Sequence, residues 1–356
     1  MTKKSITYQK KISYAGKEIF IGIDVHKSFY VMSAVCEGVV AMRSRIPAGA
    51  EQVLHFIKKY FSDAKVKACY EAGFSGFGLH RALEAEGVEN LLVHAAAVEV
   101  SSRDRVKTDK RDSKKLAVQL ESGRLCGIRI PSEEQERARL LSRTRGQLVK
   151  SITRTRNQIR MKLHQFGLVD PNDQRVLSRK IVKDILGRGV SPELQMSVEV
   201  LLSSWENMLI QKRRLEKEFR KQAESDPIQA VWHSLPGFGP ISSRSMADEL
   251  GDMSQFPNER GLFRFTGLTP GEYSSGDKVR RGHISRQGSA LLRQVLVEAA
   301  WRAIRQDEAL REDFERIAAR RGKKIAIVAI ARKLVGRARA VFRTQEAYQL
   351  GYKKAA

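Results

Sequence analysis

The chain has 356 residues, of which 42% are hydrophobic, so it is long enough for two or three domains with their own cores. Lys and Arg number 65 against 40 Asp and Glu, and this net charge of +25 predicts polyanionic partners, above all nucleic acids. No apolar run approaches the roughly 20 residues that span a bilayer, which argues against a membrane partner. The lysine-rich residues 1–17 lack the apolar segment of a secretory signal, so we expect them to form a basic arm.

The three cysteines, Cys36, Cys69 and Cys126, lie far apart and form no Cys-x-x-Cys pair. This spacing argues against a zinc site and against a disulfide framework. Few and unpaired cysteines are typical of proteins in a reducing compartment, so we expect a cytoplasmic protein.

Strand and helix signals alternate over the first region, residues 18–130. Three strands are predicted first, over residues 18–26, 29–36 and 38–46. Helices and strands then alternate: a helix over 48–61, a strand ending at Glu71, a helix over 77–86, a strand over 90–94 and a helix over 109–122. The order βββαβαβα predicts an α/β domain of the ribonuclease-H type, with helices on the faces of a sheet. A Rossmann domain is less favoured, because three strands precede the first helix and no Gly-x-Gly-x-x-Gly follows a strand.

Four acidic residues stand where the elements of such a sheet end or begin. Asp24 and Glu71 each end an apolar run. Asp109 and Asp112 share one side of the helix that follows. Each acid alone could be a salt-bridged core residue or a helix cap. Together they would converge on one sheet edge, where four carboxylates are tolerable only if cations neutralise them. A pair of Mg²⁺ ions suits oxygen ligands and can polarise a phosphodiester, so the set predicts a metal-dependent enzyme acting on nucleic acid.

The second region, residues 131–228, is predicted to be mainly helical. In its second long helix, steps of four and three residues give a coiled-coil seam of Leu194, Val198, Leu201, Trp205, Met208, Lys212, Leu215 and Phe219. A patchier apolar stripe marks the first long helix, over about residues 137–166, with Leu141, Leu148, Ile152, Ile159 and Phe166. A short extra helix is expected within residues 167–192. An antiparallel hairpin, pairing with another subunit, or packing inside the protein would each bury these stripes.

The third region, residues 229–346, precedes a short tail, residues 347–356. It opens with an apolar, glycine-rich turn, Leu235 to Pro240, before a helix that starts near Ser242. Such a turn is typical either of a helix-hairpin-helix, whose backbone amides can bind a phosphate, or of a tight connection between two helices.

The rest of the third region combines a polar loop with helices. Residues 267–270 break helicity, and a loop rich in glycine, serine and basic residues runs to Gln287. Serines beside glycines usually belong to turns, so the loop by itself indicates little more than an affinity for phosphate. Two helices, over 289–304 and 325–342, are predicted to finish the region.

Five motifs together carry a resemblance to a known family. They are Gly22-Ile23-Asp24-Val25-His26-Lys27, Glu71-Ala72-Gly73, Lys107-Thr108-Asp109-Lys110-Arg111-Asp112, Leu235-Pro236-Gly237-Phe238-Gly239 and the loop from Gly267 to Gly276. With them, the chain resembles over nearly its whole length the DEDD-type insertion-sequence transposases. These form the IS one-ten and eleven-eleven group, which includes the bridge-RNA-guided serine recombinases. The lysine-rich arm and residues 167–192 depart from the family pattern without touching these motifs.

The resemblance implies a RuvC-like domain over residues 18–130 and a transposase domain over residues 229–346. The catalytic tetrad that binds two Mg²⁺ ions is matched by Asp24, Glu71, Asp109 and Asp112. The nucleophilic serine falls on Ser275, with Ser274 as the second choice. In this family the serine attacks a DNA phosphate and forms a phosphoserine, which requires a metal ion or a base to activate the hydroxyl.

The resemblance also implies the partners of the enzyme. A structured noncoding guide RNA pairs with donor and target DNA, and a homo-oligomer, a dimer or a tetramer, shares its active sites between subunits in a prokaryotic cytoplasm or nucleoid. Basic residues then contact phosphates, because the guide supplies the sequence recognition. The predicted nucleic-acid-binding residues are Arg143, Arg154, Arg160, Lys278, Arg280, Arg281, Arg286, Arg332, Lys333 and Arg337. A solvated basic surface is the alternative for each of them.

Two other functions remain open. A junction-resolving or structure-selective nuclease would use the same acids with a metal-activated water and form no covalent adduct with DNA. A non-catalytic nucleic-acid-binding protein would retain a degenerate domain, although the presence of all four acids argues against it.

Overall fold

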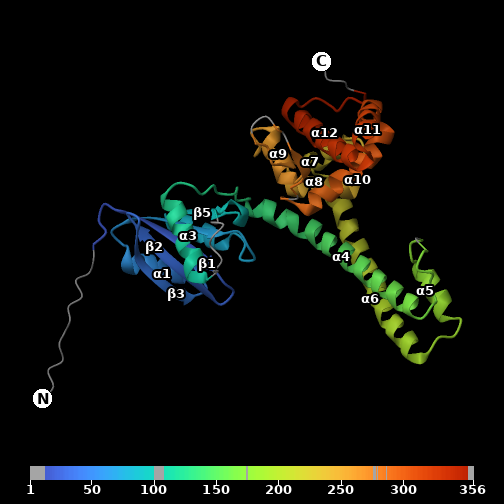
Figure 1. The fold of residues 1–356 in the computed structure, drawn as a ribbon, viewed down its shortest axis with the longest axis horizontal. Helices are drawn as coiled ribbons and strands as arrows, with labels where there is room; N and C mark the ends of the chain where they lie inside the picture. The colour runs from blue at the N-terminus through green and yellow to red at the C-terminus, as the bar shows by residue number, and fades with distance from the viewer. Residues whose placement is uncertain are drawn as a thin grey trace. The chain divides into compact units, whose positions relative to one another are not determined.

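The computed structural model describes residues 13–99, 108–173, 175–275, 278, 280–285 and 287–351 (Figure 1). The chain divides into two compact units, Met1–Pro131 and Ser132–Ala356. Each unit has its own hydrophobic core. Most of the predicted basic arm, together with Lys107 and Arg286, lies outside the described residues. In the described part of the chain, no helix is long and apolar enough to cross a membrane.

The first unit contains a five-stranded mixed sheet. Its strands are β1 (Glu18–Val25), β2 (Phe29–Cys36), β3 (Val39–Pro47), β4 (Lys65–Glu71) and β5 (Glu89–Val93), in the spatial order β3-β2-β1-β4-β5. β2 pairs antiparallel with β1 and with β3, whereas β4 runs parallel to both β1 and β5. The predicted mixed α/β domain and its order of elements are confirmed.

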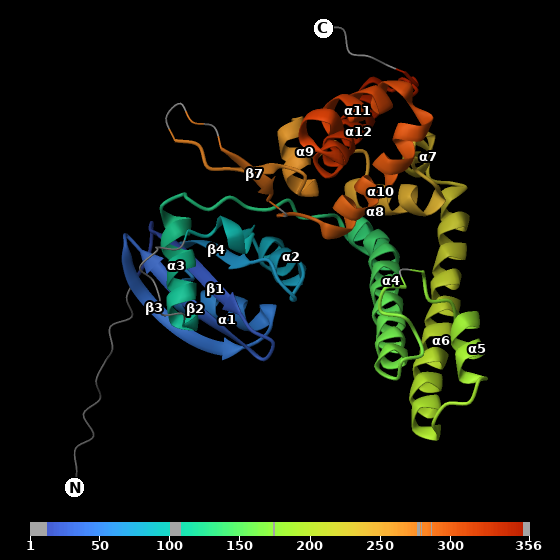
Figure 2. The ribbon, with the colours of Figure 1, turned by 45° about the vertical axis from the view of Figure 1, so that its right-hand side comes forward.

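Helices cover both faces of this sheet (Figures 1 and 2). They are α1 (Ala50–Tyr60), α2 (Gly78–Ala85) and α3 (Asp109–Glu121), and a short 3-10 helix, η1 (Ala95–Ala97), follows β5 without burying a residue. Side chains alternate along a strand, so Ile19, Ile21 and Ile23 of β1 share one face, where they are fully buried with α1 and α2. Gly22 and Asp24 therefore belong to the opposite face, against which α3 packs.

The second unit begins with a helical hairpin. Its helices are α4 (Glu133–Gln165), α5 (Arg179–Leu186) and α6 (Pro192–Ala223). The two long helices, α4 and α6, lie side by side and antiparallel, with α5 packed against them (Figures 1 and 2). Val198 and Trp205 of the predicted seam are buried in the shared core. Phe166 is 56% exposed, because α4 ends at Gln165, and Leu163 is buried in its place. Supercoiling of α4 and α6 around each other, as in a coiled coil, stays a prediction.

The rest of the second unit is a helical bundle. It consists of α7 (Pro227–Ser234), α8 (Pro240–Leu250), α9 (Glu259–Thr266), α10 (Ala290–Gln306), α11 (Glu308–Arg321) and α12 (Lys323–Thr344). The mostly helical character predicted for this half of the chain is confirmed. Helix α11 was not predicted, because it is mostly charged and buries little more than Ala309, Leu310 and Phe314. The segment expected to be an irregular loop contains two short strands, β6 (Pro270–Glu272) and β7 (Arg281–Ile284), paired antiparallel.

The glycine-rich turn before α8 is a tight connection between helices. Gly237 has φ 84°, and a Cβ there would lie 2.1 Å from the carbonyl oxygen of Ala299, so α10 packs directly on the turn. The amide of Gly237 donates to the side chain of Gln306, and that of Gly239 donates to Ser242. Because both amides already have acceptors within the bundle, this turn is better explained by packing than by phosphate binding.

Candidate active site

Helix α3 packs on a row of three small residues. Gly22 of β1 lies in register with Ser33 of β2 and Cys69 of β4. A Cβ at Gly22 would overlap the backbone of Ser113, so glycine allows α3 to touch the strand. The hydroxyls of Ser33 and Ser113 are hydrogen-bonded at 2.9 Å. Burial raises the pKa of the Cys69 thiol, which stays protonated and donates to the Leu116 carbonyl at 3.5 Å. These contacts fix where the first turn of α3 lies.

The first turn of α3 and the ends of two strands surround one hollow. Asp24 follows Gly22 by two residues and so lies on the face that carries α3. Strands β1 and β4 are parallel neighbours, so they place Asp24 and Glu71 at the same end of the sheet. A hollow of about 490 Å³ is lined by all four predicted acids together with one histidine: Asp24, Glu71, Asp109, Asp112 and His26.

His26 is the residue that the interpretation of the sequence missed. Its Nε2 lies 3.2 Å from Asp24 Oδ2 and 3.4 Å from Asp109 Oδ2. Among the described residues, Asp24, His26 and Asp109 form a group whose possible metal-ligand atoms all lie within 4.8 Å of one another. The signal in the sequence was the spacing Asp-x-His at the end of a strand, since residues two apart point to the same face of a strand.

The negative charges around the hollow favour the binding of a cation. Burial raises the pKa of the Asp24 carboxyl, His26 lowers it, and the nearby charges of Asp109 and Asp112 raise it further. Asp112 also forms an ion pair with Lys115 at 3.5 Å. A half-buried carboxylate that faces like charges is costly unless a positive charge joins it. Carboxylate oxygens and an imidazole nitrogen are common protein ligands of divalent metal ions.

The predicted nucleophile lies on the hairpin formed by β6 and β7. Ser275 pairs with Lys278 across the hairpin through two backbone hydrogen bonds of 3.3 Å, and its side chain is exposed. The neighbouring Ser274 hydroxyl donates to Glu272 Oε1 at 2.7 Å and accepts from the Arg280 amide at 3.3 Å. The Ser274 side chain is therefore tied into the hairpin. The part of the motif at Gly276 lies outside the described residues.

Two of the predicted phosphate contacts on α4 also serve the structure. Arg143 donates from Nε and a terminal nitrogen to the buried Glu249 carboxylate, at 2.7 and 3.0 Å. Arg160 donates to the carbonyl oxygens of Asp173 and Arg175 and so holds the loop after α4.

Three more of these basic residues have partners in the bundle. The partners are the Phe263 ring for Arg332, at 4.8 Å, Asp313 for Lys333, and Asp307 and Tyr348 for Arg337. Arg154, Lys278 and Arg280 have exposed side chains. The side chain of Arg281 and all of Arg286 lie outside the described part of the chain. Contact with phosphates stays a prediction for all ten.

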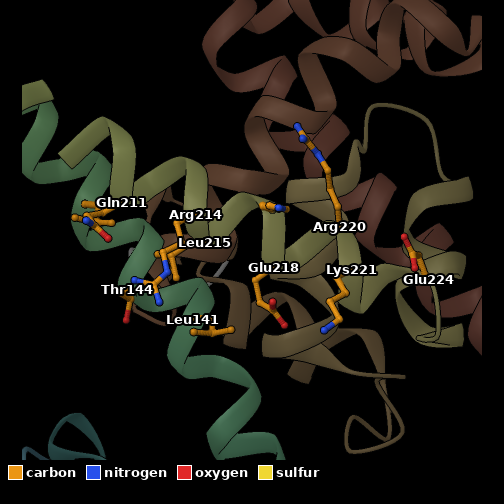
Figure 3. A pocket seen from close by; sticks show the side chains of 11 residues that line it. Leu141, Thr144, Gln211, Arg214, Leu215, Glu218, Arg220, Lys221 and Glu224 are labelled. Atoms are coloured by element: carbon orange, nitrogen blue, oxygen red, sulfur yellow. The ribbon is translucent and has the colours of Figure 1, made fainter. Parts of the chain in front are cut away.

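A second hollow, of about 1030 Å³, lies between α4 and α6 (Figure 3). Its lining includes three leucines, namely Leu141, Leu148 and Leu215, and four basic residues, namely Arg214, Lys217, Arg220 and Lys221. Its two acids are Glu218 on α6 and Glu224, which directly follows the last residue of α6, and Lys221 lies between them in the view of Figure 3. This lining differs from the acid-rich hollow of the first unit.

The chain matches two models of transposases. Residues 21–168 match a model of DEDD transposases of the IS110 type, and residues 230–315 match the Transposase IS116/IS110/IS902 family. A putative transposase, y4qE, of Sinorhizobium fredii is 28% identical over 290 residues, 80% of this chain and 72% of that protein.

Two further relatives are named for their mobile elements. The transposase for insertion sequence element IS1111A of Coxiella burnetii is 24% identical over 99% of this chain and 97% of its own length. The transposase for insertion sequence element IS1533 of Leptospira borgpetersenii is 26% identical over 80% of this chain and 85% of its own length. The chain therefore belongs to the DEDD transposases of the IS110 and IS1111 type, enzymes that cut and rejoin DNA.

Proposed function

We propose that Asp24, Glu71, Asp109 and Asp112 are catalytic and hold two Mg²⁺ ions at the end of the sheet. The observation that carries this proposal is the hollow that all four acids line. Two parallel strands and the first turn of α3 contribute these acids. Bound Mg²⁺ would supply a Lewis acid that polarises the scissile phosphate and stabilises the charge on the attacking and leaving oxygens. The protein's part is to fix the positions of the carboxylates before DNA arrives.

We assign the first unit to the ribonuclease-H-like, RuvC-like type of domain. Its support is the strand order β3-β2-β1-β4-β5, in which an antiparallel meander continues into two parallel strands. The functional division of the second unit into a helical region, residues 131–228, and a transposase domain, residues 229–346, is part of the same proposal. So is a basic N-terminal arm over residues 1–17.

Ser275 is the proposed nucleophile of the transposase. Its exposed side chain sits near the tip of a hairpin, where DNA can reach it, and the Ser274 hydroxyl is already engaged with Glu272. In the reaction, the Ser275 Oγ–P bond forms as a P–O bond of the DNA backbone breaks. The hydroxyl proton is lost, and the released DNA oxygen takes up a proton. Attack by a DNA hydroxyl on the phosphoserine reverses these changes and rejoins the strand.

Trapping the phosphoserine tests this step. The full-length protein is incubated with Mg²⁺, RNA transcribed from the flanks of its gene, and nicked DNA that carries the element end. Denaturing gels then reveal DNA joined to protein, and mass spectrometry locates the modified residue. We expect an adduct on Ser275 that is absent from Ser275→Ala and present in Ser274→Ala. Cleavage without an adduct would overturn the proposal and favour a nuclease that uses activated water.

We propose that a structured noncoding RNA guides the enzyme and that its subunits assemble into a dimer or a tetramer. The net charge of +25 supports binding to both nucleic acids, and Arg154, Lys278 and Arg280 present exposed basic side chains to them. The remaining predicted phosphate contacts are Arg143, Arg160, Arg281, Arg286, Arg332, Lys333 and Arg337. Sequencing of the RNA that copurifies with the protein tests guidance, and a transcript from elsewhere in the genome would contradict it.

A further inference from the structure

We propose that His26 is itself a metal ligand, so that one of the two ion positions has a mixed oxygen and nitrogen ligand set. This inference rests on the proposed role of the acids as metal ligands. It adds a residue outside the acidic tetrad and changes which ions the position prefers.

The backbone holds His26 at the mouth of the hollow. His26 follows β1 directly, and its amide donates to the Phe29 carbonyl at 3.0 Å, which closes the turn between β1 and β2. Its ring stacks on the Phe29 ring, with centroids 4.6 Å apart and planes inclined by 28°. Arg45 packs its guanidinium 3.8 Å from the centre of the same Phe29 ring. The imidazole is thus positioned by the backbone turn and by the Phe29 ring before any ion binds.

The distances around Nε2 match a shared cation. Two ligands that are each about 2.1 Å from one ion lie at most about 4.2 Å apart. His26 Nε2 lies 3.2 Å from an Asp24 oxygen and 3.4 Å from an Asp109 oxygen, within that limit. A hydrogen bond explains less, because Nε2 carries at most one hydrogen and cannot donate fully to two carboxylates. An ion accepts electron pairs from all three atoms at once.

The nitrogen ligand predicts a preference among metal ions. Mg²⁺ takes oxygen ligands almost exclusively, whereas imidazole strengthens the binding of transition ions. The position that includes His26 should therefore bind Mn²⁺ or Co²⁺ more tightly than Mg²⁺. The other acids that line the hollow, Glu71 and Asp112, then remain for an ion held by oxygen alone.

Mn²⁺ bound to the full-length protein provides a direct test, because its unpaired electrons sense a coordinated nitrogen. We expect electron spin-echo modulation from ¹⁴N in the wild-type protein, and altered frequencies after labelling with [¹⁵N]histidine. His26→Gln should remove the modulation and weaken Mn²⁺ binding by at least the roughly 10- to 100-fold that losing an outer-shell partner costs. Binding of Mg²⁺, measured by competition, should weaken less.

The matched control is His94→Gln. His94 is exposed at the end of β5, at the same edge of the sheet, and it caps η1 by accepting from the Ala96 amide at 3.1 Å. This variant should keep the modulation and the wild-type affinity. If Mn²⁺ binding depends on Asp24 but the bound ion shows no modulation from a histidine nitrogen, the role of His26 is overturned and the acidic site is retained. Absence of any Mn²⁺ binding that depends on Asp24 overturns both.

Discussion

A Cβ atom on Gly22 would lie 2.1 Å from the carbonyl oxygen of Ser113, so β1 and α3 meet backbone to backbone. Asp24 follows Gly22 on the strand, and Asp109 precedes Ser113 by one turn of the helix. The contact therefore sets the separation between the carboxylates at one side of the hollow. The packing of the sheet and the geometry of the candidate site depend on the same glycine.

Gly22→Ala should destabilise the first unit and loosen its acidic site. The added methyl meets backbone atoms, which cannot rotate away, so we expect a loss of about 1–3 kcal/mol or more in unfolding free energy. Hydrogen exchange of the full-length protein should show less protection in β1 and α3. Gly78→Ala is the control, since a Cβ there meets nothing within 4 Å. Equal protection in the two variants would show that the contact is unimportant.

Asp24→Asn should raise the melting temperature of the metal-free protein at pH 7. Burial raises the pKa of this carboxyl, so the folded chain prefers the neutral form and the charge costs stability above that pKa. The advantage of Asn should shrink as the pH falls through the raised pKa, and vanish below about 3.9, where Asp24 is protonated in both states. Mg²⁺ should stabilise the wild-type protein and not the variant. A lower melting temperature for metal-free Asp24→Asn would contradict this account of the site.

Replacing Arg143 or Arg154, both on α4, with alanine should have different effects: the first should lower stability, and the second should weaken binding to nucleic acid. Arg143→Ala removes the bidentate partner of buried Glu249 and leaves it with Arg139, whose Nε lies 3.8 Å away. Because the Arg143 side chain is 56% exposed, we expect a loss of about 1–3 kcal/mol, less than for a fully buried pair. Urea unfolding of the full-length protein measures it.

Arg154→Ala should leave urea unfolding unchanged. If Arg154 contacts one phosphate, the slope of log affinity for RNA or DNA against log salt should fall by about 0.7–0.9. A stability loss in Arg154→Ala equal to that of Arg143→Ala would show that both arginines are structural.

The first unit was largely predictable, because its strands are short apolar runs with distinct ends. The same pattern placed Asp24 and Glu71 at strand ends, and parallel pairing brings those ends together. The packing of α3 was not predictable, since it depends on a row of small side chains on three strands that only the register aligns. His26 was missed because its role depends on Asp109, which is distant in the sequence.

The second unit was harder to predict in detail. Helix α11 has few apolar residues, so its hydrophobic periodicity is weak. Strands β6 and β7 are three and four residues long and are separated by glycine, serine and charged residues, which resemble an irregular loop. The acids that Arg143 and Arg337 meet in the fold could not be predicted, because those acids lie far away in the sequence. Contact of these arginines with phosphates stays a prediction.

We propose above all that the four acids of the first unit hold the Mg²⁺ used to cut DNA. The most direct test measures Mg²⁺-dependent cleavage of element-end DNA in the presence of RNA from the flanks of the gene. The variants to compare with the wild-type protein are Asp24→Asn, Glu71→Gln, Asp109→Asn and Asp112→Asn. Each variant should bind DNA as the wild-type protein does and cut none. Glu51→Gln, at the exposed start of α1, should cut normally. Cleavage at the wild-type rate by any of the four variants would contradict the account.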